Sequence, residues 1–269
     1  MLFLLLAVIL VIYAIHGLFA LLFHTEPIEE LFEATPEPTY DPEEYQVYSW
    51  SRLSYDGDYY VYEDTGYSSL TGIDVSYAQG DIDWQKVKDD GIEFAVIRAG
   101  YRGYESGELH TDTGFYENLE EARSAGLKTA VYFFSQALNE TEAEEEADYV
   151  MGLLEGYDNI EFIAYDFEEA HSDGRISQMK NEDITDCAKA FLLRVKENGY
   201  QPMMYGSQSF LWEEIDRLEL NDITEYWMAS YGKVKPEYPY RFAIWQYSED
   251  ARVEGISGPV DLDLWMIPK

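Results

Sequence analysis

Short apolar runs alternate with amphipathic stretches along the chain from about residue 71 onward. The apolar runs are typical of strands, which we predict at residues 72–76, 94–99, 129–134, 160–166, 202–206, 226–230 and 242–246. Between them, helices are predicted at residues 83–90, 115–125 and 141–155, and from residue 184 to a stop at Gly199. Thr141 and Glu144 have the spacing of a capping box for the third helix. This alternation indicates parallel strands with covering helices, in either a barrel or an open sheet.

The first residues follow a different pattern. Residues 2–23 are almost continuously apolar and would span roughly 33 Å as a helix, enough to cross a bilayer. No Lys or Arg precedes the run and no clear Ala-x-Ala site follows it, which disfavours a cleaved signal peptide. We therefore predict a transmembrane anchor over residues 1–24. The positive-inside rule does not indicate which end of this segment would face the cytoplasm, because neither flank carries a nearby Lys or Arg.

Residues 25–69 are predicted to be an acidic linker. Residues 24–69 contain twelve acidic residues and one basic residue, Arg52, and four prolines lie in their first half. Repulsion between like charges and the prolines should keep the segment extended. Eight tyrosines between residues 40 and 67 are unusual for a disordered spacer, so this part either packs on the domain or is a Tyr-rich tail. Residues 70–269 form the predicted catalytic domain.

Composition narrows the possible functions. With 53 acidic and 18 basic residues, the formal charge is -35, which disfavours nucleic acid as a partner. The single cysteine, Cys187, excludes an intrachain disulfide and is predicted to be a core residue. The four histidines have no metal-binding spacing, and no Gly-x-Ser-x-Gly elbow, phosphate loop or dinucleotide fingerprint is present. We therefore expect no metal or cofactor, and a hydrolase that relies on acids alone.

Asp166 and Glu168 are the strongest candidates for chemistry. They follow the apolar run that begins at Ile160, and residues two apart in a strand share a face. Two neighbouring carboxylates repel, so that one retains its proton while the other ionises. This is the minimum requirement for glycoside hydrolysis. The alternative is that the two acids cap the next helix or lie in solvent.

Other polar or aromatic residues end the predicted strands, where active sites of parallel α/β folds form. Asp74 is one, with a turn or helix cap as its alternative role. The others are candidate substrate-binding residues, with core packing as the alternative for each aromatic ring: Arg98, Tyr101, Tyr132, Tyr205, Trp227, Tyr231 and Gln246.

Residues 70–269 resemble the glycoside hydrolase family 25 lysozymes. The resemblance begins with the motif GIDVS at residues 72–76 and continues through FAVIRAGYRGY at residues 94–104 and GLKTAVYFFSQA at residues 126–137. It then includes Asp166-x-Glu168, the Trp227-x-Ala229-x-Tyr231 stretch, WQYS at residues 245–248 and GISGPVD at residues 255–261. Phe167 departs from it, because a smaller residue is commoner there. Glu169 adds a third acid, which is expected to face away from the site.

The resemblance implies a modified TIM-like (β/α) barrel with fewer helices than a full eightfold one. It also implies a muramidase that cleaves the β-1,4 bond between N-acetylmuramic acid and N-acetylglucosamine in peptidoglycan. Glu168 would be the general acid and Asp166 its partner, which orients the substrate's 2-acetamido group. Asp74 and Asp261 would be the other two acids of the family site. The family is usually described as retaining, with the acetamido group as the possible nucleophile.

We therefore expect a single-pass membrane protein whose catalytic domain is extracytoplasmic and acts on peptidoglycan glycan strands in wall remodelling or local wall opening. One alternative is a glycan-binding module of the same fold that has lost catalysis. Another is the same enzyme class acting on chitin-like or other N-acetylated glycans.

Overall fold

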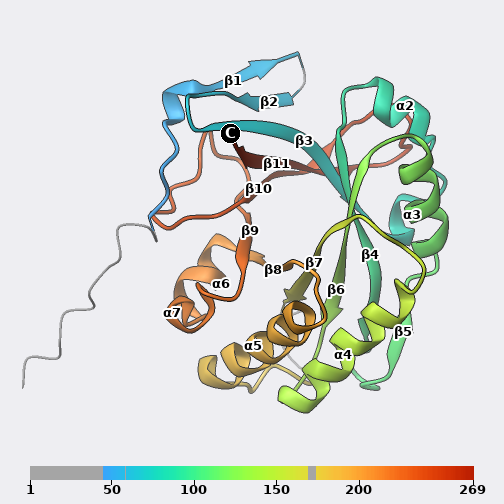
Figure 1. Cartoon of the computed structure of the whole chain (residues 1–269), viewed down its shortest axis with the longest axis vertical. Helices are drawn as coiled ribbons and strands as arrows, with labels where there is room; N and C mark the ends of the chain where they lie inside the picture. Colours follow the sequence, from blue (N-terminus) through green and yellow to red (C-terminus); the bar gives the residue numbers. More distant parts are fainter. Residues whose placement is uncertain (1–44, 58, 169–173) are drawn as a thin grey trace, which may run out of the picture. The chain divides into compact units, whose positions relative to one another are not determined.

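The computed structural model describes residues 45–57, 59–168 and 174–269 (Figure 1). They belong to one compact unit, Pro42–Lys269. None of the helices in these ranges is long and apolar enough to cross a membrane. The predicted anchor, residues 1–24, lies outside the described residues, as do the first part of the linker and Glu169.

Eight strands form a closed barrel. They are β3 (Tyr67–Val75), β4 (Phe94–Arg102), β6 (Lys128–Ser135), β7 (Ile160–Phe167), β8 (Pro202–Ser207), β9 (Glu225–Ala229), β10 (Ile244–Ala251) and β11 (Val260–Pro268). The sheet closes because β3 pairs with both β4 and β11. A short strand, β5 (Leu109–Thr111), folds back antiparallel onto β4. The predicted barrel is confirmed, and the open sheet is excluded.

The last strand corrects the expectation of parallel strands. β11 was not predicted, and it runs antiparallel to both of its neighbours, β10 and β3. The reversal is possible because β10 and β11 form a hairpin, which needs no crossover helix. Its register places Asp261 directly opposite Asp74. The start of β11 therefore lies beside the C-terminal end of β3.

Helices cover only part of the barrel. The main ones are α2 (Trp84–Asp89), α3 (Phe115–Ser124), α4 (Glu140–Leu153) and α5 (Asn181–Glu197), and two short helices, α6 (Gln208–Glu213) and α7 (Arg217–Leu220), follow β8. The predicted capping box of α4 is wrong. Its N-cap is Asn139, whose side chain accepts a hydrogen bond from the Glu142 amide. Gly126 and Gly199 follow α3 and α5 with φ of 83° and 87°, a conformation that favours glycine after a helix.

Two apolar clusters hold the unit together. One fills the barrel with inward-facing side chains, among them Phe94, Phe162 and Trp227. The other lies between the barrel wall and its coverings, and includes Phe191 and Cys187, which is buried as predicted. Because the interior is filled with side chains, a substrate has access only at the ends of the strands.

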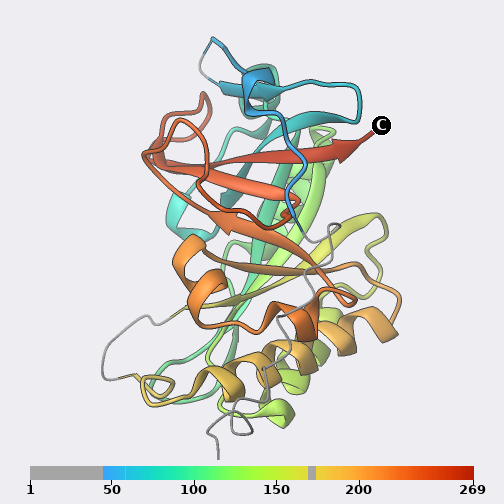
Figure 2. The same ribbon diagram turned by 90° about the vertical axis from the view of Figure 1, so that its left-hand side faces the viewer.

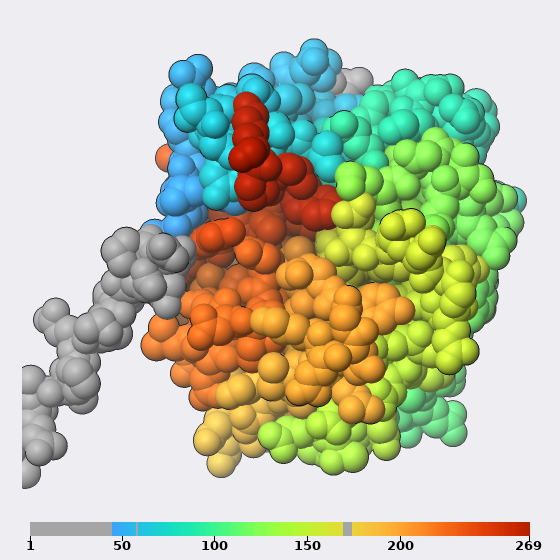
Figure 3. Space-filling model, viewed as in Figure 1, coloured from blue at the N-terminus to red at the C-terminus, as the bar shows by residue number. Residues whose placement is uncertain are grey.

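The described part of the Tyr-rich segment packs on the barrel. It forms a short 3₁₀ helix (Trp50–Arg52) and an antiparallel hairpin of β1 (Leu53–Asp56) and β2 (Tyr59–Tyr62), which lies against β3 and β11 (Figures 1 and 2). Tyr62 is fully buried, and the Tyr48 hydroxyl donates a 2.5 Å hydrogen bond to the Phe242 carbonyl. In Figure 3 this blue segment and the red C-terminal strand share one face. From residue 45 onward, the segment packs rather than forming a free tail.

Candidate active site

Acidic side chains gather at the C-terminal end of the barrel. Asp74 comes from β3, Asp166 from β7, and Asp261 and Asp263 from β11. Glu168 directly follows β7 and has an exposed side chain. Asp74, Asp166 and Asp263 are buried, with 7%, 5% and 0% of their surface exposed. Because residues two apart share a strand face, these acids project from three strands toward a common volume.

Hydrogen bonds fix the position of Asp74. The side-chain amide of Gln246 donates to Asp74 Oδ2 at 2.6 Å. The Gln246 carbonyl oxygen in turn accepts from the hydroxyls of Tyr205 at 2.8 Å and Tyr231 at 2.5 Å. The two tyrosines orient the amide, which leaves its nitrogen directed at the carboxyl group. This chain links three predicted substrate-binding residues to a predicted catalytic acid.

The three acids of β3 and β11 hold protons more tightly than free carboxyl groups. Burial raises the pKa of Asp74 well above its usual value, and the charges of Asp263 and Asp261 raise it further. Burial likewise raises the pKa of Asp263, although a 2.7 Å hydrogen bond from Trp227 Nε1 opposes the rise. Burial and the Glu249 charge raise the pKa of Asp261 to about 6. The cluster therefore carries fewer than three negative charges near neutral pH.

Asp166 and Glu168 form a second coupled pair. Burial raises the pKa of Asp166 well above its usual value, the Glu168 charge raises it further, and Arg98 opposes the rise. Partial loss of solvent also raises the pKa of Glu168, and a hydrogen bond with Tyr205 opposes the rise. When one carboxyl ionises, the other holds its proton more tightly, so the pair shares one proton over a range of pH.

One carboxyl oxygen of Asp166 is able to accept a hydrogen bond from a ligand. Its Oδ1 atom is buried and has no hydrogen-bond partner among the residues that the structure describes. A buried carboxylate oxygen without a donor is unfavourable, so such an atom at the mouth of a barrel is a position for a ligand donor. The pKa of Asp166 would fall once a donor bound there.

Aromatic and basic side chains line the same end of the barrel. Arg98 Nε donates to Asp112 Oδ2 at 2.7 Å, and Nη2 forms an ion pair with the same oxygen at 2.7 Å. The Arg98 guanidinium lies 5.6 Å from the centre of the Tyr101 ring. The Trp227 ring packs edge to face against Tyr205 and Tyr132, with centroids 4.6 and 6.1 Å away. Six of the seven predicted substrate-binding residues thus surround the acids, and Tyr101 extends the group outward from β4. Their roles toward a substrate stay predictions.

Two functional candidates were missed from the sequence. Asp263 lies two residues after Asp261, the same spacing as in Asp166-x-Glu168, but its strand was not predicted. Gln136 directly follows β6 and was not among the predicted substrate-binding residues. It is 1% exposed, and its side-chain amide donates to the Glu168 carbonyl at 3.0 Å, which fixes the main chain of the candidate acid.

A buried ion pair, Arg102–Glu146, contacts the main chain of Gln136. Arg102 Nε donates to Glu146 Oε1 at 2.7 Å, and the same oxygen accepts a hydrogen bond from the main-chain N–H of Gln136 at 3.4 Å. Burial raises the pKa of Glu146 to about 7, although the hydrogen bonds from Ser135 and Arg102 oppose the rise. The pair ties α4 to the ends of β4 and β6. Within the described ranges, no group of three or more His, Cys, Asp or Glu residues is arranged to hold a metal ion.

The fold and the site together define a class of protein. A closed α/β barrel that carries a pair of interacting carboxyl groups and aromatic walls at one end is the arrangement expected of a glycoside hydrolase. More specifically, the chain belongs to the glycosyl hydrolases family 25, whose family model matches residues 73–256. The resemblance found in the sequence is thereby confirmed.

Two lysozymes and an autolysin are similar to this chain. An autolytic lysozyme of Clostridium acetobutylicum is 27% identical over 194 residues, which are 72% of this chain and 55% of that protein. A bacterial lysozyme of Streptomyces coelicolor superposes with a TM-score of 0.60 at 26% identity, and the match covers 74% of this chain and 92% of the lysozyme. The modular autolysin LytC of Streptococcus pneumoniae, solved with a synthetic peptidoglycan ligand, gives 0.63 at 27% identity over 73% of this chain and 46% of that one. The chain thus spans about half the length of the clostridial and pneumococcal proteins.

Proposed function

We propose that the barrel is an N-acetylmuramidase that hydrolyses the β-1,4 bond between N-acetylmuramic acid and N-acetylglucosamine in peptidoglycan. The observation that carries the proposal is the coupled Asp166–Glu168 pair, with its unpaired buried oxygen, at the open end of the barrel. The similarity to lysozymes supports the choice of substrate. The presence of all four predicted acids at one end of the barrel disfavours an inactive glycan-binding module.

In the proposed reaction, substrate binding decides which carboxyl group holds the shared proton. The N–H of the 2-acetamido group donates to Asp166 Oδ1, which stabilises the ionised form of Asp166 and leaves the proton on Glu168. Arg98 favours the same distribution through its positive charge. Glu168 is then the general acid beside the glycosidic oxygen.

The bonds change in two steps. In the first, the acetamido oxygen attacks C1, the bond from C1 to the leaving oxygen breaks, and the proton of Glu168 moves to that oxygen. In the second, Glu168 accepts a proton from a water molecule that attacks C1 and releases the acetamido oxygen. Each step inverts C1, so the product retains the configuration of the substrate. Asp74 and Asp261 hold the sugar at this position, with Asp74 oriented by Gln246.

The activity is tested by digesting purified peptidoglycan with the full chain and identifying the new reducing ends by mass spectrometry. We expect reducing N-acetylmuramic acid ends. Reducing N-acetylglucosamine ends would contradict the assigned bond, and cleavage of N-acetylglucosamine oligomers but not of peptidoglycan would favour a chitin-like substrate. Absence of any release would favour the binding-module alternative.

We propose further that residues 1–24 anchor the chain in the cell membrane, with the barrel on the extracytoplasmic side, where it serves wall remodelling or local wall opening. The length of the apolar run and the location of the substrate support this proposal. Protease added to intact, wall-stripped cells is expected to degrade the barrel while a cytoplasmic marker survives. Survival of both until the cells are lysed would contradict this topology.

A further inference from the structure

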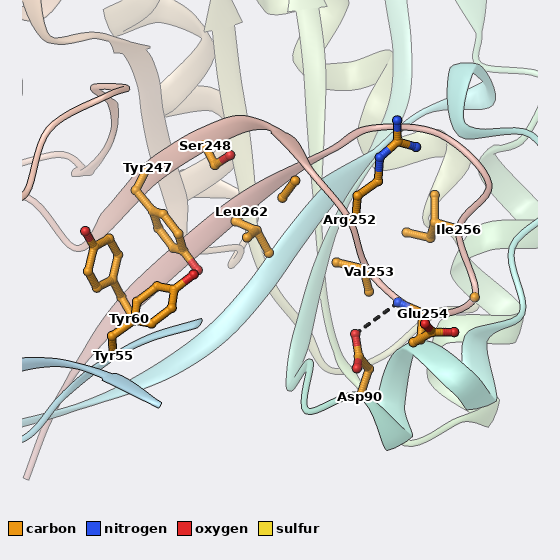
Figure 4. Close-up of a pocket in the computed structure, with 12 residues that line it drawn as sticks. Tyr55, Tyr60, Asp90, Tyr247, Ser248, Arg252, Val253, Glu254, Ile256 and Leu262 are labelled. Atoms are coloured by element: carbon orange, nitrogen blue, oxygen red, sulfur yellow. Dashed lines mark hydrogen bonds between the residues drawn. The ribbon is translucent and has the colours of Figure 1, made fainter. Parts of the chain in front are cut away.

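A second concave site lies on the outer side of the barrel. A cavity of about 760 Å³ opens between the β1–β2 hairpin and the loop of residues 252–256 (Figure 4). Its floor is the outer face of the β10–β11 pair, through Tyr247 and Leu262. The hairpin at residues 53–62 precedes residues 73–256, which match the family model, so one wall of the cavity is an addition to that part of the chain.

The cavity and the active site lie on opposite faces of one pair of strands. Gln246 faces into the barrel and binds Asp74, whereas its neighbour Tyr247 faces the cavity. In the same way, Asp261 belongs to the acidic cluster and Leu262 lines the cavity. A ligand in the cavity would therefore be held close to the catalytic end of the barrel without occupying it.

One side of the cavity is a wall of tyrosines. The Tyr60 ring packs edge to face against Tyr247 and Tyr55, with centroids 5.0 and 5.2 Å away, and stacks on Trp245 at 5.6 Å. Tyr60 is thereby held on three sides, while Tyr55 at the rim is 60% exposed. Figure 4 shows the three tyrosines grouped on one side of the cavity, apart from Arg252, Asp90 and Glu254. The wall is a rigid aromatic surface that is open to a ligand.

A buried hydroxyl in this wall lacks a hydrogen-bond partner among the described residues. Tyr247 is 8% exposed, and its hydroxyl makes no well-formed hydrogen bond among the described residues. Burial raises the pKa of this hydroxyl, and the nearby main chain of Tyr60 opposes the rise. A buried hydroxyl without a partner is unfavourable and calls for a polar group of a ligand.

The opposite side of the cavity is polar. It carries Arg252, Asp90 and Glu254. Asp90 is fixed, because its Oδ2 accepts the Tyr59 hydroxyl at 2.5 Å and the Glu254 amide at 3.0 Å. Arg252 forms no ion pair within the described part of the chain, and its Nη1 atom makes a long 3.5 Å hydrogen bond to the Ser257 carbonyl. Its guanidinium is therefore available to a ligand.

This combination fits a neutral saccharide. The apolar faces of sugar rings stack on aromatic rings, and their hydroxyls bond to carboxylate and guanidinium groups, which the two sides of the cavity supply. A polyanion is disfavoured, because two carboxylates face one arginine and the whole chain carries a charge of -35. A wholly apolar ligand would leave the polar side and the Tyr247 hydroxyl unpaired.

We propose that this cavity is a second, non-catalytic binding site for N-acetylated glycan strands. Because it takes its ligand class from the substrate, this inference rests on the proposed function. Binding a strand there keeps the barrel near an insoluble polymer between cleavage events, which raises the effective concentration of substrate. The site should therefore matter for insoluble wall and not for short soluble glycans.

The test separates binding from cleavage. In full chains that also carry Glu168→Gln, Tyr55→Ala and Arg252→Gln should each weaken co-sedimentation with purified peptidoglycan about fivefold to tenfold, as the loss of one stacking or charged contact predicts. Tyr247→Phe removes only the unpaired hydroxyl, so it should weaken retention without lowering the melting temperature. Tyr116→Ala is the matched control, because this α3 tyrosine is 45% exposed and lies outside the cavity lining.

The same cavity substitutions are then measured in the active enzyme. Rates on insoluble peptidoglycan should fall severalfold, while rates on a short soluble oligosaccharide of alternating N-acetylmuramic acid and N-acetylglucosamine stay within about twofold. Unchanged retention in the Tyr55, Arg252 and Tyr247 variants would overturn the proposal, as would an equal loss on soluble and insoluble substrates. Because retention is measured without cleavage, a chain that binds but releases nothing would contradict the proposed muramidase and leave the cavity proposal standing.

Discussion

Glu168→Gln is expected to lower kcat on peptidoglycan by at least about 10²-fold while KM stays nearly unchanged. The amide has almost the same shape as the carboxyl group, but it has no proton that it can give to the leaving oxygen. Gln136 holds the main chain at this residue through the 3.0 Å bond to the Glu168 carbonyl, so the substitution should not displace the strand end. Initial rates and product analysis over a range of substrate concentrations measure both parameters.

Glu161→Gln is the matched control for this variant. Glu161 lies on the same strand as Asp166 but near its other end, where it pairs with Lys128 at 2.6 Å on the surface. We expect its removal to leave the rate within about twofold, because exposed ion pairs contribute little to stability. If Glu168→Gln retained the rate of Glu161→Gln, the proton donor would have to be another group, and the assignment of Glu168 would fail.

Local patterns predicted much of the barrel because its strands are buried and its helices are amphipathic. The run before Asp166 is apolar at nearly every position, as expected of a strand covered on both faces. The stripe along α5 that includes Cys187 and Phe191 is buried against the barrel, as its periodicity predicts. Such elements can be predicted from a short stretch of sequence because each face of the strand or helix is buried or exposed in the same way along its length.

The missed elements depend on contacts with distant parts of the chain. β11 alternates between inward acids and outward apolar residues, so the half-buried Asp261 and the buried Asp263 have the pattern of an exposed strand. Only pairing with β3 brings them beside Asp74. The β1–β2 hairpin is similar, because Tyr59 and Tyr62 resemble part of a polar tail until packing on the barrel buries them.

The candidate site was easier to predict in its composition than in its protonation. The spacing of Asp166 and Glu168 indicated a coupled pair, and the structure places both at the same end of the barrel. What no spacing could predict is that Asp166 is the more deeply buried of the two, which favours the proton on Asp166 before substrate binds. The proposed substrate N–H donor changes that balance, so recognition of the acetamido group and activation of Glu168 become one event.

Asp166→Asn tests this coupling. We expect kcat to fall by roughly 10-fold to 150-fold at the best pH, the effect of losing a hydrogen bond from the acetamido N–H to a charged acceptor. The shape of the pH profile should also change. In the natural protein, the pair loses two protons in sequence, and the charge left by the first loss raises the pKa of the second. Activity should therefore be bell-shaped, on the acidic side of neutral, between these two steps.

With asparagine at position 166, one carboxyl group of the pair remains. The charge of Asp166 then no longer raises the pKa of Glu168, so the alkaline limb should move to lower pH, and the acid limb that arises from the pair should flatten. If Asp166 acted only by raising the pKa of Glu168, the variant would recover its full rate at low pH. A rate that stays depressed across the whole profile, together with a shifted alkaline limb, requires that Asp166 also contacts the substrate. Kinetics from about pH 3 to pH 9, compared with the Glu161→Gln control, distinguish these outcomes.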